Sequence, residues 1–109
     1  MTVKEFTEAT DFRCLCLPFP EKEIEGAYIG DLLSWVMGKA KPGDAWITIM
    51  SNLNVIAVAS LADVSCIILA EGVTLEDEVL SMAESKGINV LLAPTSAYDT
   101  AIKVYEALK

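Results

Sequence analysis

The sequence predicts an α/β fold of three layers, in which helices cover both faces of a mainly parallel sheet of about four strands. Short β-rich apolar runs alternate with segments of helical periodicity along the chain, and this order builds right-handed βαβ units. Two runs, 66–70 and 90–93, are apolar almost throughout, which is typical of central parallel strands buried on both faces. At 109 residues, the chain has the length of one domain, and we expect 1–109 to form it.

The N-terminal third predicts a short helix followed by a strand. Thr2 and Glu5 have the spacing of a capping box, so a helix is expected at 3–9. The mostly apolar run 13–17 is expected to be a strand because it stops at two prolines. Residues 26–29 add a short extended segment.

Helical spacing of apolar residues then runs from 29 to 40, and Asp31 is expected to start this helix. A turn closed by Asp44 follows. Residues 45–50 are rich in strand-forming side chains and are expected to form a strand.

The most apolar stretch, 55–72, predicts a buried helix that leads into a central strand. A membrane span needs about 20 predominantly apolar residues, and an Asp near its middle costs roughly 2.5–3.5 kcal/mol. This stretch is shorter, contains Asp63 and has no basic flanks, so it is not a span. Its first half is rich in alanine and its second half, 66–70, is rich in β-formers, with Asp63 at the joint.

Two helices are predicted in the last third of the chain. Thr74 and Ser96 are expected to cap them, because each precedes an apolar-periodic segment and has an Asp three positions later. The first helix ends at Lys86-Gly87, and a short buried strand at 89–93 follows it. The apolar face of the second helix consists of Tyr98, Ala101, Ile102, Tyr105 and Leu108.

The composition excludes several classes of partner. The net charge is −8 and the chain contains no Lys/Arg cluster, so nucleic acid and anionic membrane surfaces would be repelled. The hydrophobic fraction of 53% slightly exceeds the usual ~45–50%, which suggests apolar surface for a partner or a second copy. The N-terminus resembles no export signal, so a cytoplasmic location is expected.

The sequence gives little support for a catalytic site or a metal site. Cys14 and Cys16 are expected on one face of a strand, and with Cys66 they make only three soft ligands where zinc or an iron–sulfur cluster usually needs four. Core packing is the favoured role of all three, and no metal or cofactor is expected. The chain has no histidine and neither a GxxxxGK[ST] nor a GxGxxG loop, so we predict no enzyme activity.

Two surfaces remain as candidate sites. In open parallel sheets, ligands bind at the carboxyl ends of the strands, where an anion could also meet helix N-termini. Capping is nevertheless the favoured role of Thr74 and Ser96, and Glu71 with the acidic turn 76–78 would repel phosphate. The candidate ligand residues at this edge are Asn52, Asn54, Gly72, Thr74, Thr95 and Ser96.

The second candidate surface surrounds Trp35. This residue widens the apolar stripe of its helix beyond the ~100° that a core-facing helix needs. Beside Tyr28 or Met37 it would suit a protein–protein contact, since aromatic residues and Met are enriched at interface cores. The alternative is that Trp35 folds back over the domain's own sheet.

The order of these elements resembles the DRTGG domain over nearly the whole chain. The matching features are the capped N-terminal helix, GAYIGDLLS at 26–34, GDAWIT at 43–48 and the strand ending at Gly72. That family occurs within some phosphate acetyltransferases and CBS-domain pyrophosphatases, is similar to the N-terminal domain of HPr kinase, and includes stand-alone copies. Its name-giving motif is degenerate here: 51–54 replaces the Asp-Arg pair, and 70–72 retains only the last glycine of Thr-Gly-Gly.

The resemblance implies a regulatory or dimerising module without established catalysis. We therefore expect a non-enzymatic regulatory or assembly module, which works by forming a two-fold homodimer or by docking onto an enzyme partner. The alternative is a sensor that binds a nucleotide or another phosphorylated metabolite at the carboxyl ends of the strands.

Overall fold

Five helices and five strands make up the computed structural model, which describes residues 1–109. In chain order they are α1 (Val3–Ala9), β1 (Arg13–Cys16), β2 (Gly26–Ile29), α2 (Leu33–Lys39), β3 (Asp44–Thr48), α3 (Leu53–Ala62), β4 (Cys66–Leu69), α4 (Asp77–Lys86), β5 (Val90–Leu92) and α5 (Ala97–Leu108).

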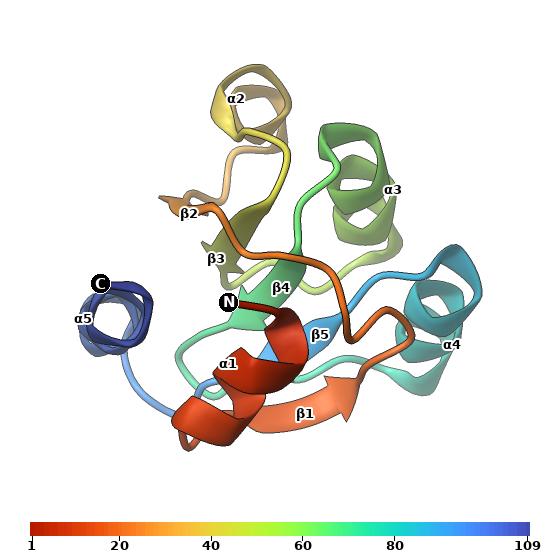
Figure 1. Cartoon of the computed structure of the whole chain (residues 1–109). Helices are drawn as coiled ribbons and strands as arrows, with labels where there is room; N and C mark the ends of the chain where they lie inside the picture. The colour runs from red at the N-terminus through yellow and green to blue at the C-terminus, as the bar shows by residue number, and fades with distance from the viewer.

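The strands form one sheet in the order β1-β5-β4-β3-β2. Strands β2 to β5 are parallel, and β1 pairs antiparallel with β5 at one edge. Helices α2, α3 and α4 cover one face, and α1 and α5 pack on the other (Figure 1). The predicted three-layer α/β fold is confirmed, with five strands rather than about four because residues 26–29 pair with β3 as β2.

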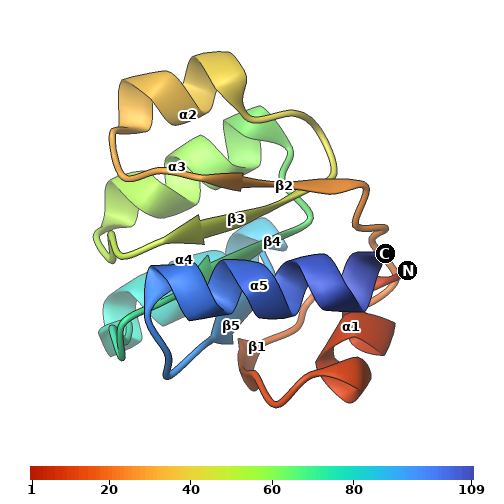
Figure 2. The ribbon, with the colours of Figure 1, turned by 90° about the vertical axis from the view of Figure 1, so that its left-hand side faces the viewer.

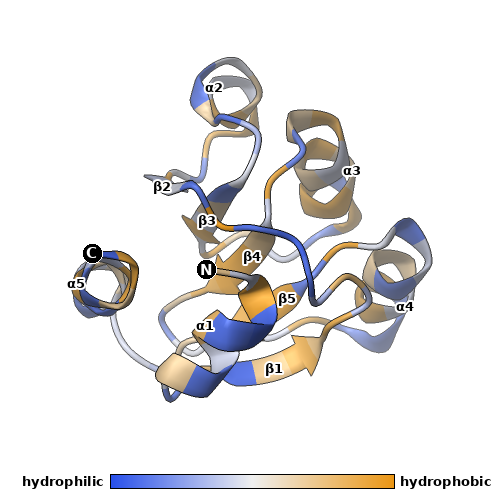
Figure 3. Ribbon diagram, viewed as in Figure 1, coloured by the Kyte–Doolittle hydropathy of each residue, from blue (hydrophilic) through white to orange (hydrophobic).

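The core lies on both sides of the central strands. Every residue of β3 and β4 is buried, and alternate side chains point to opposite faces: Trp46 and Ile67 toward α2–α4, Ile47 and Ile68 toward α1 and α5. Figure 3 shows the hydrophobic colour concentrated on these central strands and on α3. Burial on two faces accounts for the continuous apolar runs in the sequence.

Several local predictions are confirmed. The capping box of α1 is formed, with Thr2 N–H donating to Glu5 Oε1 at 2.8 Å and Glu5 N–H donating to Thr2 Oγ1 at 3.1 Å. Helix α3 ends at Asp63, which adopts a left-handed conformation (φ 56°) and leads into β4. The Asp63 carboxylate pairs with Lys22. No helix has the length and apolar character that crossing a membrane requires.

The starts of two helices were predicted wrongly. Leu32, not Asp31, precedes α2, because the Asp31 carboxylate binds the end of β3 instead: it accepts from Thr48 Oγ1 at 2.7 Å and from Ile49 N–H at 2.9 Å. Helix α4 begins at Asp77 after Glu76, and Thr74 does not cap it.

The predicted common face of Cys14 and Cys16 is also wrong. The register between β1 and β5 shifts between these two residues, and such an irregularity changes the side to which neighbouring side chains point. As a result Cys14 is exposed, whereas Cys16 and Cys66 pack in the core.

Helix α5 has the predicted N-cap, since Asp99 N–H donates to Ser96 Oγ at 3.1 Å. Of its predicted apolar face, Ala101 and Leu108 pack against the core on the sheet, whereas Tyr98, Ile102 and Tyr105 do not. Thr100 and Val104 are its buried residues, and Ala97 and Ala107 also pack against the same core in part. The largest apolar side chains, Tyr98, Ile102 and Tyr105, are exposed to 75%, 40% and 67%.

Candidate functional site

The carboxyl ends of the parallel strands bring together only part of the predicted ligand site. Asn52 and Asn54, at the start of α3, line a shallow pocket of about 430 Å³ with Glu76 and Glu78, which lie at the start of α4. The other four candidate residues, Gly72, Thr74, Thr95 and Ser96, do not line it. Two carboxylates and no Lys or Arg line this pocket, which disfavours a phosphate group there.

The N-terminus of α5 already holds a carboxylate of the chain itself. Glu71 has a left-handed backbone (φ 62°), and its N–H donates to Thr95 O at 2.8 Å. Its Oε2 accepts from the N–H of Ala97, the first residue of α5, at 2.9 Å. A carboxylate in this place satisfies a free helical N–H and interacts favourably with the helix dipole. Glu71 therefore occupies the position that an external anion would take.

The thiols are poor candidates for chemistry. Burial raises the pKa of Cys66 to about 12 and that of Cys16 to about 11. Burial, together with the charge of Glu84, also raises the pKa of Cys14. Near neutral pH all three are protonated, and the thiolate is the nucleophilic and metal-binding form. No three His, Cys, Asp or Glu residues lie close enough together to hold a metal ion.

The predicted contact residues around α2 are only partly brought together. Trp35 is 57% exposed and its ring lies 4.6 Å from Lys39 Nζ, so it does not fold back over the sheet. Met37 is also exposed, whereas Tyr28 is partly buried and packs against the core under α2 and α3. Residues two apart on a helix point to different sides, so Trp35 and Met37 do not belong to one patch.

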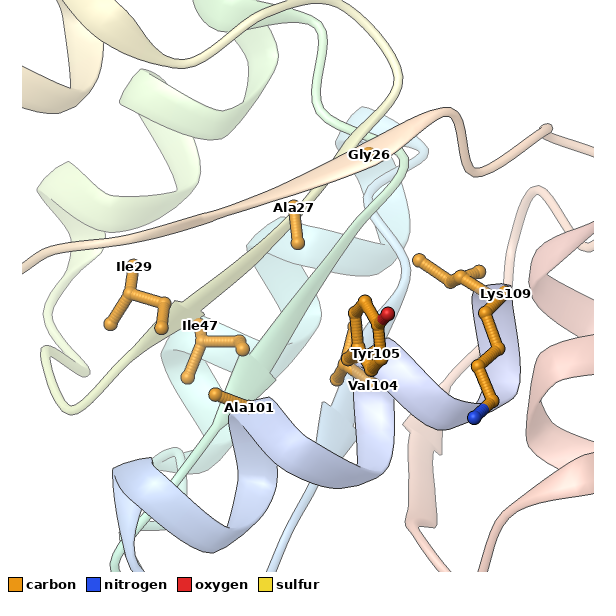
Figure 4. A pocket seen from close by; sticks show the side chains of 9 residues that line it. Gly26, Ala27, Ile29, Ile47, Ala101, Val104, Tyr105 and Lys109 are labelled. Carbon is orange, nitrogen blue, oxygen red and sulfur yellow. The ribbon is translucent and has the colours of Figure 1, made fainter.

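An apolar hollow that the sequence did not predict lies between β2 and α5. This groove has a volume of about 410 Å³. Side chains of β2 and β3 form one wall and side chains of α5 form the other (Figure 4). Its lining consists of Gly26, Ala27, Ile29, Ile47, Ala101, Val104, Tyr105, Leu108 and Lys109.

The groove exists because α5 covers the second face of the sheet only in part. Strand β2 is at the edge of the sheet, and α5 contacts both β3 and β2; Figure 2 shows the helix running along these strands. Ile29, at the end of β2, remains 52% exposed. The sequence does contain a signal for this groove. Ala27 and Ile29 alternate with Tyr28 along β2, so their side chains point to the face opposite α2 and leave apolar surface there.

An exposed stripe of α5 extends this apolar surface. We call it the α5 stripe and define it as Tyr98, Ile102, Tyr105 and Lys109, whose spacing of four, three and four residues places them along one side of the helix. The Lys109 ammonium lies 5.8 Å from the centre of the Tyr105 ring. Groove and stripe meet at Tyr105 and form one continuous surface.

Comparisons with known proteins agree with this architecture. A family model described as the DRTGG domain matches residues 22–107. A crystal structure of the CBS and DRTGG domains of the regulatory region of Clostridium perfringens pyrophosphatase, complexed with the activator diadenosine tetraphosphate, is similar at a TM-score of 0.71 and 15% identity. The match covers 97% of this chain and 46% of that one, and at this identity it shows the fold. No curated protein matches the chain.

Proposed function

Because this chain belongs to the DRTGG domain family, we propose that it is a non-catalytic regulatory module that acts through contact with another polypeptide. The observation that carries this proposal is the surface made of the β2–α5 groove and the α5 stripe. Monomeric proteins rarely expose contiguous apolar surface of more than a few hundred Å², and larger patches mark interaction sites. Here an apolar groove lies directly beside two exposed tyrosines and an exposed isoleucine.

The charge distribution supports the same surface. The chain has 16 Asp and Glu residues, yet no Asp or Glu side chain lines the groove. Contact cores are depleted in charged residues and enriched in aromatic ones, with Tyr prominent among them. A partner seated here would bury apolar side chains without desolvating a carboxylate, which is the costly step elsewhere on so acidic a protein.

Nucleotide sensing at the strand ends is a second candidate function, and the comparison with the pyrophosphatase regulatory region supports it more directly than it supports docking. That region is complexed with diadenosine tetraphosphate. The geometry of this chain opposes it, because Glu76 and Glu78 line the pocket and Glu71 occupies the N-terminus of α5. A nucleotide bound there would raise the melting temperature by mass action, which a thermal-shift titration with diadenosine tetraphosphate measures.

Site-specific photo-cross-linking tests the docking function. A benzophenone amino acid replaces Tyr105 in the full chain, produced at its natural level in its own cells, and Leu61 on α3 serves as the matched control because it is 74% exposed. We expect a discrete protein adduct from position 105 and none from position 61. Equal adducts from both positions, or none from position 105, would contradict the proposal.

A further inference from the structure

We infer that the partner binds by strand addition: an extended segment of another protein pairs with the free edge of β2 as a sixth strand, and its apolar side chains enter the β2–α5 groove. This inference rests on the proposed function and states how the partner is recognised. Strand addition draws its affinity from main-chain hydrogen bonds and its specificity from pockets for alternate side chains.

The outer edge of β2 carries backbone groups that have no partner in the chain. Strand β2 pairs with β3 alone, in parallel register, and in such a pair alternate residues of a strand bond to the neighbour. Gly30 N–H donates to Ile47 O at 3.2 Å, so Tyr28, two residues earlier, has the same orientation. The N–H and C=O groups of Ala27 and Ile29 therefore point away from β3, and no turn or loop of the chain bonds to them.

The fold leaves this edge uncovered. Figure 2 shows β2 between α2 and α5, with no segment of the chain in front of it. Ala27 and Ile29 are both exposed, and the same two residues line the groove. One approaching segment can therefore meet their free backbone groups and the groove beside them at the same time.

The opposite edge of the sheet is protected in ways that β2 is not. Proteins block edge strands with charges, prolines and bulges. Strand β1 carries Arg13, and its register with β5 is irregular between Cys14 and Cys16. Strand β2, with the sequence GAYI, has no charge and no proline, and its register with β3 is regular throughout. It is therefore the edge suited to accept a further strand.

The groove defines the chemistry of the added segment. Alternate side chains of the segment point to the α5 side, where the lining is apolar and Lys109 is its single charged residue. Burying an unpaired charge there would be costly, so we expect aliphatic or aromatic residues at every second position. A lone segment brings only its own charge, whereas a second copy of this chain brings −8 and would be repelled.

A proline substitution tests the backbone half of this site in the full chain. Ala27→Pro removes the outward N–H and no bond to β3, because proline is tolerated on the open side of an edge strand. With the benzophenone amino acid at position 105, in the cells that naturally produce the chain, this variant should reduce the adduct about 10-fold or more. The matched control is Glu76→Pro, at an exposed position whose φ of −70° already suits proline, and it should retain the adduct. Circular dichroism checks that both variants are folded.

Methylation of the partner's backbone tests the added strand with the wild-type chain. The fragment joined to position 105 is identified by mass spectrometry and synthesised, and its backbone N–H groups are methylated one at a time. Alternate N–H groups of a strand point to the same neighbour. Calorimetry should therefore show affinity reduced about 10-fold or more at every second residue and less than about twofold at the residues between. Losses without this alternation, as a helical segment would give, overturn the inference.

The outcomes separate this inference from the function on which it rests. An adduct at position 105 that survives in a folded Ala27→Pro variant, or that Glu76→Pro reduces equally, overturns strand addition and leaves the docking function standing. An adduct made of two copies of this chain does the same. If Ala27→Pro does not fold, the methylation pattern decides. The absence of any adduct at position 105 overturns both.

Discussion

Replacing Trp46 with alanine is expected to lower the free energy of unfolding by about 3–5 kcal/mol, the usual cost of truncating a buried aromatic residue to alanine. Trp46 is fully buried at the centre of β3, in the core that α2, α3 and α4 cover. Its Nε1–H donates to the carbonyl of Gly30 at 2.9 Å. The residue therefore both fills the core and holds the segment that joins β2 to α2.

The Trp46→Phe variant separates these two contributions. It retains most of the apolar contact but leaves the Gly30 carbonyl without its donor, so a loss of roughly 1–2 kcal/mol is expected. Urea unfolding followed by circular dichroism measures both variants. A Phe variant as unstable as the Ala variant would mean that the hydrogen bond, and not packing, dominates at this position.

Asn89→Ala is expected to lower the free energy of unfolding by roughly 2–4 kcal/mol, because it removes three hydrogen bonds and leaves the Phe19 N–H and the Ser65 carbonyl without this partner. The buried Asn89 side chain accepts from Phe19 N–H at 2.9 Å and donates to Phe19 O at 2.8 Å and Ser65 O at 3.0 Å. It joins the loop after β1 to the segments that precede β4 and β5. The Phe19 carbonyl also accepts from Lys22 N–H at 3.3 Å and so keeps one donor in the variant.

The control for this prediction is Asn54→Ala. Asn54 is exposed, and substitutions at exposed positions of this kind usually change stability by less than about 0.5 kcal/mol. The same urea titration compares the two variants. A loss of less than about 1 kcal/mol for Asn89→Ala would show that the loop after β1 is not held by this side chain.

Local chemistry and burial made much of the fold predictable. The capping box needs only Thr2 and Glu5, three residues apart, and it forms as expected. Strands buried on both faces must be continuously apolar, so β4 could be recognised at 66–70. The same logic placed Asp63 at the joint between α3 and β4, where the chain turns and a carboxylate can meet Lys22.

The predictions failed where a side chain binds a residue that is distant in sequence. The sequence predicts that Asp31 starts a helix, but the hydrogen-bond donors to its carboxylate lie at the end of β3, 17 and 18 residues away. Glu71 was expected only to repel anions, whereas it binds Ala97 N–H, 26 residues further along the chain. Helix periodicity cannot show such contacts, because they depend on how the strands are ordered in the sheet.

Helix α5 shows a different limit of what helical periodicity can predict. Periodicity identified the stripe that contains Tyr98, Ile102 and Tyr105, but it does not state what covers such a stripe. In this domain, Thr100 and Val104 face the sheet and the larger side chains are left exposed beside the groove. An amphipathic pattern alone cannot distinguish a helix that packs on its own sheet from one that packs on another chain.

The central claim is that this domain contacts its partner through the β2–α5 groove and the α5 stripe, and that it binds no nucleotide at the carboxyl ends of the strands. Amide hydrogen exchange of the full chain in an extract of its own cells, which supplies the partner, tests it, with Tyr105→Glu as the reference whose docking is impaired and with or without diadenosine tetraphosphate. We predict that residues 26–29 and 97–108 exchange more slowly in the wild type than in the variant, and that the nucleotide leaves 51–54 and 71–74 unchanged. Equal exchange of α5 and β2 in both proteins, together with nucleotide-dependent protection at 51–54 and 71–74, would contradict the claim.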